Sequence, residues 1–333
     1  MAILPKFLQK DDTVALVCTA RKIDFHLVEN ARKHLESWGF QVIVGESATA
    51  SFHQYSGDDE LRTRDFQAQL DNPNVKAIVC LRGGFGTARI IDKLDFSEFV
   101  KHPKWITGYS DVTVIQNHIL KNYNIASLHA EMPLKFPAFC KGIPAYAGMT
   151  SRNESLNALK NALFGIFESL EGQALRHCEG GTTEAIHNVP GLLRLTARND
   201  GTTAELVGGN LAILCSLLGS SSEIDTAGKI LFLEDVGEWL YAIDRMMTTL
   251  KRAGKLEKLA GLAVGQFTNL KDDKTSFGKS AYEIIAEHVA DYDYPVIFDI
   301  PAGHCEINKS LIFGGVYEMS VSEKNATLKP IIV

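Results

Sequence analysis

Three polar residues follow apolar, strand-like runs, and together they have the types that nucleophilic hydrolysis needs. Ser110 comes after the run 105–107, Glu234 follows Ile-Leu-Phe-Leu, and His304 follows the run 296–300 and a Pro-Ala-Gly loop. A serine hydroxyl, an imidazole base and a carboxylate that orients the imidazole form a catalytic triad when a fold brings them together. The sequence therefore makes these three residues candidates for a nucleophile, an orienting acid and a general base.

The segment around Ser110 predicts a sharp turn between a strand and a helix. Gly108 breaks the strand, and from Val112 onward apolar residues recur with helical spacing. Such a turn holds a hydroxyl clear of the backbone and aims the N–H groups of the helix start at the group under attack. The full G-x-S-x-G motif is absent because Val112 replaces its last glycine. The alternative is that Ser110 or Asp111 only caps the helix, a common role for both residue types.

Simpler interpretations exist for the other two candidates as well. A carboxylate such as Glu234 at a strand end can cap the next helix, and a single loop histidine is most often a surface residue. His129 lies near another strand end and is an alternative imidazole. Cys305, next to His304, is a weak alternative nucleophile.

A glycine-rich segment, Arg82 to Thr87, follows the apolar run 77–81. It can cradle phosphate, form a simple turn, or offer backbone N–H groups to an oxyanion, because glycines let a substrate approach the backbone closely. The match to the dinucleotide-binding motif is weak because Arg89 stands where the third glycine belongs. The oxyanion interpretation applies if Ser110 is the nucleophile.

Apolar strands alternate with helices along the chain, which predicts an α/β fold. In the first part this pattern indicates a doubly wound, mostly parallel sheet covered on both faces, with ligands bound beyond the carboxyl ends of the strands. We expect an N-terminal α/β domain at 1–140 with the nucleophile, a linker with one helix at 141–190, and a C-terminal α/β domain at 191–333 with the glutamate and histidine. A helix is expected to follow the glycine-rich segment Arg82 to Thr87 and to run through Leu94, and a single terminal strand is expected from Leu311 to Ser322.

Composition narrows the classes of protein and partner. The 333 residues suffice for two domains, and 45% hydrophobic and 22% charged residues are typical of a globular protein. With 34 basic and 40 acidic residues the net charge is −6, and no basic stripe with aromatic residues points to nucleic acid as a partner. No leader-like or bilayer-spanning run is present, so we expect a cytoplasmic protein with no membrane partner. The six cysteines form no C-x-x-C pair, which indicates neither a disulfide framework nor a zinc site.

At these residues the chain resembles the serine LD-carboxypeptidases of peptidoglycan recycling, a family that includes the microcin C immunity peptidases. The resemblance covers most of the chain, and its pieces stand in the same order here. They are Arg82-Gly83-Gly84-Phe85-Gly86, Gly108-Tyr109-Ser110-Asp111-Val112-Thr113, Gly208-Gly209-Asn210-Leu211, Leu233-Glu234-Asp235-Val236 with Tyr241, Asp244 and Arg245, and Gly303-His304.

The resemblance implies a Ser–His–Glu triad with Ser110 as nucleophile, His304 as base and then acid, and Glu234 as the residue that orients the imidazole. It implies an oxyanion held by the backbone N–H groups of Gly84 and Asp111, in an interdomain cleft. No metal or cofactor and a homodimer are implied too. The implied reaction releases C-terminal D-Ala from a murein tetrapeptide by hydrolysis of an LD-amide bond.

Two departures from the family leave the substrate open. His129-Ala130-Glu131-Met132-Pro133 stands where the family usually has His-Gly-Pro-Met, and the segment from Cys140 to Ser151 is longer than usual. Tyr146 in that segment is an aromatic side chain that can stack on a base, as an aminoacyl or peptidyl nucleotide substrate would need. The remaining alternative is a ligand-binding module without catalysis, built on the same sheet.

Overall fold

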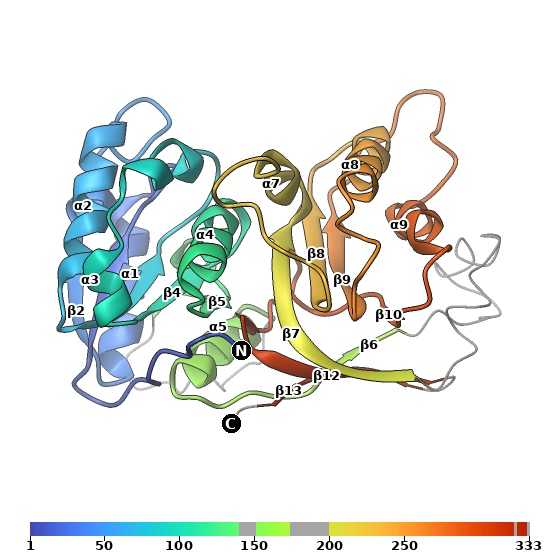
Figure 1. The fold of residues 1–333 in the computed structure, drawn as a ribbon. Coiled ribbons are helices and arrows are strands. Elements are labelled where there is room, and N and C mark those ends of the chain that lie inside the picture. The colour runs from blue at the N-terminus through green and yellow to red at the C-terminus, as the bar shows by residue number, and fades with distance from the viewer. Residues whose placement is uncertain (140–150, 174–199, 323–324, 332–333) are drawn as a thin grey trace. The chain divides into compact units, whose positions relative to one another are not determined.

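The computed structural model describes residues 1–139, 151–173, 200–322 and 325–331 of the chain (Figure 1). The chain forms two compact units, each with its own sheet. Unit 1 comprises Met1–Phe167 and Glu306–Gly314, and unit 2 comprises Glu168–Cys305 and Gly315–Val333. Among the described helices none is long and apolar enough to cross a membrane.

Unit 1 contains a six-stranded sheet with the order β11-β5-β4-β3-β1-β2. Strands β1 to β5 run parallel to their neighbours, and β11 pairs antiparallel with β5 at the edge. Nearly every residue of β1, β3 and β4 is buried, which explains why these strands are continuous apolar runs in the sequence. The strands are β1 Thr13–Val17, β2 Gln41–Val44, β3 Val75–Cys80, β4 Trp105–Gly108, β5 Ser127–His129 and β11 Leu311–Phe313.

Helices connect the parallel strands of unit 1, as the alternating sequence pattern predicts. The α-helices are α1 Phe25–Ser37, α2 Asp59–Asp71, α3 Ser97–Lys101, α4 Thr113–Tyr123 and α5 Ser151–Leu163. Short 3₁₀ turns complete the connections: η1 Glu46–Ala48, η2 Thr87–Arg89, η3 Ile91–Lys93, η4 Ser110–Val112 and η5 Pro133–Lys135.

The helix expected to follow the glycine-rich segment and run through Leu94 is not formed. The segment folds instead as the two short turns η2 and η3. Its first residue, Thr87, directs both its backbone N–H and its hydroxyl to the carboxylate of Asp111. This contact with a residue outside the segment is invisible in the local pattern of apolar residues.

Unit 2 contains a seven-stranded mixed sheet with the order β10-β9-β8-β7-β12-β13-β6. Strands β7, β8, β9 and β10 are parallel to one another, whereas β12 pairs antiparallel with β7 and β13, and β13 pairs antiparallel with β6. The long strand β7, the curved yellow band in Figure 1, pairs first with β12 and then with β8. The strands are β6 Leu170–Gly172, β7 Asp200–Asn210, β8 Ile230–Val236, β9 Gly261–Thr268, β10 Val296–Ile297, β12 Val316–Val321 and β13 Ala326–Ile331.

The described helices of unit 2 are α7 Leu211–Ser216, α8 Leu240–Arg252 and α9 Ala281–Val289. Of these helices, α7 and α9 begin at side-chain caps. The side chain of Asn210 accepts from the N–H of Ile213 at the start of α7, and Ser280 and Glu283 form a capping box at the start of α9.

The single terminal strand expected from Leu311 to Ser322 is wrong. The structure divides this segment into β11, which pairs with β5 in unit 1, and β12, which belongs to the sheet of unit 2. Gly314 separates them with a φ of +89°, a conformation that favours glycine. The pattern of buried residues continues through this break, so periodicity alone does not reveal the change of sheet.

A buried lysine binds the carbonyl groups at the C-terminal end of α2. Lys104 is 1% exposed, and its Nζ donates hydrogen bonds to the carbonyls of Gln69, Leu70 and Asn72 at 2.9, 2.8 and 2.6 Å. The last carbonyls of a helix lack partners within the helix, and a cation also suits the negative end of the helix dipole. Burial lowers the pKa of Lys104 to about 8.

We therefore expect Lys104→Met to destabilise unit 1. A buried carbonyl left without a partner costs about 1–3 kcal/mol, so the free energy of unfolding should fall by at least about 2 kcal/mol. Urea denaturation followed by circular dichroism measures the change. The control is Lys101→Met, since Lys101 is an exposed lysine paired with Glu98. This substitution should change the free energy of unfolding by less than about 1 kcal/mol. Equal effects of the two substitutions would contradict the stabilising role of Lys104.

Candidate active site

Ser110 lies on the turn between β4 and α4 in a conformation that is unusual for a serine. Its φ is +62°, in the left-handed region that costs a non-glycine residue about 1–2 kcal/mol. The strand before it ends at Gly108, where φ is +149° and a Cβ atom would lie 2.9 Å from the Val112 side chain. The predicted strand-to-helix turn is thus confirmed, and Gly108 allows it even though the last glycine of the elbow motif is missing. Strained residues of this kind concentrate at functional sites.

The glycine-rich turn packs directly against the side chain of Ser110. A Cβ atom at Gly83 would lie 3.2 Å from Ser110 Oγ and 3.3 Å from the backbone nitrogen of Asp111. The next residue, Gly84, is exposed and has a φ of +117°. Because Gly83 has no side chain, unit 1 brings the turn, the Ser110 hydroxyl and the Asp111 amide together.

The Asp111 side chain points away from solvent and holds the glycine-rich segment in place. Its Oδ2 accepts from the Thr87 N–H at 2.9 Å and lies 2.6 Å from Thr87 Oγ1, which in turn is 2.8 Å from Thr19 Oγ1. Burial raises the pKa of Asp111, and the hydrogen bonds from Thr87 oppose this rise. The carboxylate therefore connects the residue after Ser110 to the end of the turn that contacts it.

A fully buried arginine, Arg62, forms hydrogen bonds that hold the glycine-rich segment. Nη1 of Arg62 donates to the carbonyls of Thr19 and Gly86, and Nη2 pairs with Asp59. A Cβ atom at Gly86 would lie 2.6 Å from Nη1, so the glycine is needed for this approach. Arg62, Thr19 and Thr87 were not predicted as site residues, because nothing in their local sequence shows that they are buried around one loop.

In unit 2 the two remaining candidates meet. Glu234, near the end of β8, is completely buried, and its Oε2 lies 2.7 Å from Nδ1 of His304. The same oxygen accepts the backbone N–H of His304 at 3.0 Å, and Thr268 Oγ1 donates to the His304 carbonyl at 2.6 Å. Contact between Nδ1 and a carboxylate favours the tautomer in which Nδ1 carries the hydrogen and Nε2 accepts a proton. The pair therefore has the geometry of an oriented general base.

Two glycines allow the His304 loop to approach β8 closely. At Gly303, φ is +102° and a Cβ atom would lie 2.6 Å from Cγ and Oε2 of Glu234. At Gly265 in β9, a Cβ atom would lie 2.6 Å from the carbonyl oxygen of Ala302. The register between β8 and β9 also shifts beside Glu234, between Leu233 and Asp235. These features set the position of the imidazole.

Asp235, the neighbour of Glu234, serves a different contact. Its Oδ1 accepts from Asn210 Nδ2 and its Oδ2 from the Ala212 N–H, both at 2.9 Å, which attaches β8 to the start of α7. Burial, together with the charge of Glu234, raises the pKa of Asp235 to about 6. The two adjacent acids thus point to separate partners, and the one that meets His304 is Glu234.

The alternative imidazole and the alternative nucleophile weighed from the sequence are both buried side chains. His129 is buried in β5, with its ring 5.7 Å from that of Tyr109 and 5.2 Å from that of Phe313. Cys305 is 8% exposed, and its Sγ contacts the Gly303 carbonyl at 3.7 Å. The segment from Cys140 to Ser151, with Tyr146, lies outside the described residues except for Ser151 itself. No group of three or more His, Cys, Asp or Glu within the described ranges can hold a metal ion.

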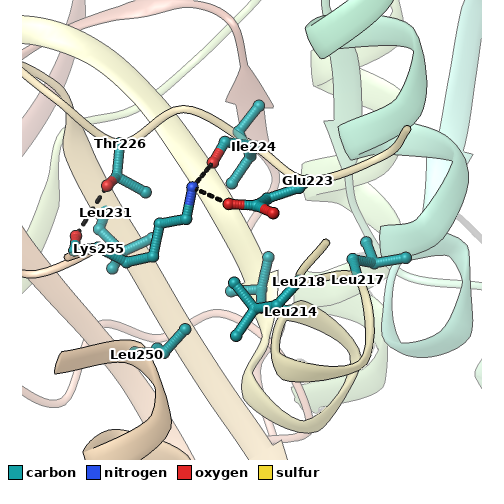
Figure 2. Close-up of a pocket in the computed structure, with 9 residues that line it drawn as sticks. All are labelled: Leu214, Leu217, Leu218, Glu223, Ile224, Thr226, Leu231, Leu250 and Lys255. Carbon is teal, nitrogen blue, oxygen red and sulfur yellow. Dashed lines mark hydrogen bonds and ion pairs between the residues drawn. The ribbon is translucent and has the colours of Figure 1, made fainter. Parts of the chain in front are cut away.

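A small apolar pocket in unit 2 contains none of the predicted site residues. Figure 2 shows Leu214 of α7, Leu217 and Leu218 just after this helix, and Leu231 and Leu250 around the pocket. Lys255 closes one side by pairing with Glu223 at 2.5 Å and donating to the Ile224 carbonyl at 2.9 Å (Figure 2). Its charge is thus already balanced by its own surroundings.

Comparisons with known proteins identify the family of the chain. Family models match residues 14–130 as an LD-carboxypeptidase N-terminal domain and residues 203–319 as an LD-carboxypeptidase C-terminal domain. The chain is 32% identical to a probable murein peptide carboxypeptidase of Bacillus subtilis, over 98% of this chain and 94% of the relative. It is 26% identical to the murein tetrapeptide carboxypeptidase of Pseudomonas aeruginosa, over 91% and 92% of the two chains.

Solved structures show the same fold. The muramoyltetrapeptide carboxypeptidase of Oxalobacter formigenes superimposes with a TM-score of 0.77 at 23% identity, over 96% of this chain and 98% of that one. The microcin C7 self immunity protein MccF, in complex with aspartyl sulfamoyl adenosine, gives 0.80 at 17% identity over 99% of both chains. From the matching models and the relatives in sequence, the chain belongs to the LD-carboxypeptidase family, peptidase family S66, and is a serine carboxypeptidase, a hydrolase.

Proposed function

We propose that this protein hydrolyses the LD-amide bond that joins the C-terminal D-Ala to a murein tetrapeptide. The observation that carries the proposal is the 2.7 Å contact between the His304 imidazole and the buried carboxylate of Glu234. An imidazole held in this way is a general base for a serine, and Ser110 occupies the strained turn that a nucleophile needs. The names of the sequence relatives supply the class of substrate.

In the proposed reaction Ser110 Oγ attacks the carbonyl carbon of the LD-amide while His304 Nε2 takes the hydroxyl proton. The backbone N–H groups of Gly84 and Asp111 stabilise the oxyanion that forms. His304 then gives the proton to the amide nitrogen, the C–N bond breaks, and D-Ala leaves with a free amine. Water, deprotonated by His304, hydrolyses the acyl-enzyme ester and restores Ser110. Glu234 orients the imidazole and stabilises its protonated form throughout.

The family resemblance also supplies the biological setting of the proposal. We propose a cytoplasmic enzyme that works without a cofactor, as a homodimer, on peptides released from the cell wall for recycling. The proposed nucleophile belongs to unit 1 and the proposed base to unit 2.

An alternative substrate is an aminoacyl or peptidyl nucleotide, hydrolysed by the same three residues. The fold of MccF, a microcin C7 self immunity protein, favours it as the second candidate. The two are separated by kcat/KM on a murein tetrapeptide and on an aminoacyl sulfamoyl adenosine. We expect the tetrapeptide to be the better substrate, and the reverse order would establish the alternative.

Ser110→Ala should abolish the release of D-Ala. Removal of a triad serine lowers kcat by a factor on the order of 10⁶, because no other group can form the acyl-enzyme. Release of D-Ala from the tetrapeptide is measured by chromatography, and circular dichroism verifies the fold. Ser97→Ala, at an exposed helix start in the same unit, is the control and should keep full activity. If Ser110→Ala keeps as much as a tenth of the activity, Ser110 is not the nucleophile.

Glu234→Gln should keep the shape of the site but lose its charge. In a comparable triad the corresponding change lowers kcat by a factor on the order of 10⁴, since the imidazole loses the partner that fixes its tautomer. The same assay measures the loss, and Glu257→Gln, an exposed acid in unit 2, serves as the control. A near-normal rate would show that Glu234 does not orient the base.

A further inference from the structure

Two arginines, Arg21 and Arg82, flank the Gly83–Gly84 turn of unit 1, and the backbone of a third cationic residue, Lys22, contacts Arg82. Arg21 and Lys22 follow β1, and Arg82 follows β3 directly before the two glycines. In the described part of the chain none of the three forms an ion pair with a carboxylate. The turn beside Ser110 is therefore a locally positive surface in a chain whose net charge is −6.

Arg82 is held in place by one hydrogen bond and keeps other donors available. Its Nη1 donates to the Lys22 carbonyl at 2.8 Å. Its Nε is buried without a hydrogen-bond partner among the described residues, although a guanidinium has five N–H donors. Within the described ranges the Arg21 side chain makes one hydrogen bond, a long one of 3.4 Å to Gln54 Oε1. Burial, and then the charge of Arg21, lowers the pKa of Arg82, so an anion beside the two guanidinium groups would relieve their repulsion.

Both arginines adjoin the turn that packs against Ser110. A Cβ atom at Gly84 would lie 2.7 Å from Cγ and Cδ of Arg21, so the Arg21 side chain runs across that glycine. Arg82 is bonded to Gly83, whose missing Cβ would lie 3.2 Å from Ser110 Oγ. The Ser110 hydroxyl and the two arginines thus lie on the two sides of the same turn.

At the C-terminus of a peptide, the last amide bond lies close to the terminal carboxylate. In a C-terminal residue, one nitrogen and one Cα separate the scissile carbonyl carbon from the terminal carboxylate carbon, a distance of roughly 3–4 Å. A group that binds the terminal carboxylate must therefore lie close to the nucleophile. Guanidinium groups are suited to this task because their fork of donors matches both carboxylate oxygens.

We propose that Arg82, assisted by Arg21, binds the terminal carboxylate of the substrate and so restricts cleavage to the last amide bond of a peptide. The inference rests on the proposed function, because it takes Ser110 as the nucleophile. The two arginines bind and position the substrate, and they take no part in proton transfer.

The test compares two substrates that differ only at the carboxylate: a murein tetrapeptide that ends in D-Ala and the same peptide as its C-terminal amide. The wild-type protein should prefer the free acid in kcat/KM by about 100-fold, the scale of one or two hydrogen bonds to a charged group. Arg82→Gln should lower kcat/KM for the acid by about 10- to 100-fold and change that for the amide by less than about threefold. Arg21→Gln should act in the same direction with a smaller loss.

The control is Arg64→Gln, which removes the same charge from an exposed arginine of unit 1 that pairs with Glu46. It should leave both substrates unaffected, and circular dichroism should show the same fold for all variants. A wild-type protein that cleaves acid and amide equally would overturn the proposal. So would an Arg82→Gln variant that slows both substrates by the same factor.

A binding measurement separates this inference from the proposed reaction. Ligand-observed NMR with N-acetyl-D-alanine and its amide requires no turnover. Wild-type protein should bind the acid only, and Arg82→Gln should bind neither. If the tetrapeptide is not hydrolysed but the acid binds selectively, the substrate proposal fails and the carboxylate site stands. If acid and amide bind alike, the carboxylate site fails whatever the enzyme hydrolyses.

Discussion

The carboxylate of Glu234 is wholly buried, and a buried carboxylate is stable only where hydrogen bonds replace the water that it has lost. His304 donates its backbone N–H and places its Nδ1 on the same oxygen. To reach that position, the loop before His304 must lie against β8, which Gly303 and Gly265 allow because neither has a side chain. The need to satisfy one buried acid thereby fixes the position and the tautomer of an imidazole.

In unit 1 another buried carboxylate, that of Asp111, also holds a loop in place through hydrogen bonds. Asp111 is buried and directs its carboxylate to Thr87, so the residue that follows Ser110 is attached to the far end of the glycine-rich turn. Arg62 holds the same turn through the Gly86 carbonyl. Polar groups beneath the turn thus position backbone N–H groups and a hydroxyl at its surface. A network of this kind is stable because most of its members have partners, and it keeps the turn rigid.

Adjacent acids in unit 2 show how neighbouring residues of one type acquire different roles. Glu234 and Asp235 are both buried at the end of β8, but successive residues of a strand point to opposite faces of the sheet. One carboxylate therefore meets the His304 loop, and the other attaches β8 to Asn210 and the start of α7. Substitution of either acid is consequently expected to affect a different part of the unit.

The sequence by itself determined the alternation of strands and helices, the turn at Ser110 and the identity of Glu234 and His304 as candidates. These depend on local properties: apolar periodicity, glycines at turns, and polar residues directly after buried strands. The roles of Ser110, Gly84 and Asp111 stay predictions. Only the tertiary structure decided that Glu234 and His304, which are far apart in the sequence, touch, and that Thr87 and Arg62 hold the glycine-rich turn. It also decided that 311–313 and 316–321 belong to different sheets. Contacts of this kind depend on strand register and on how closely two loops approach, and no local pattern of residues contains that information.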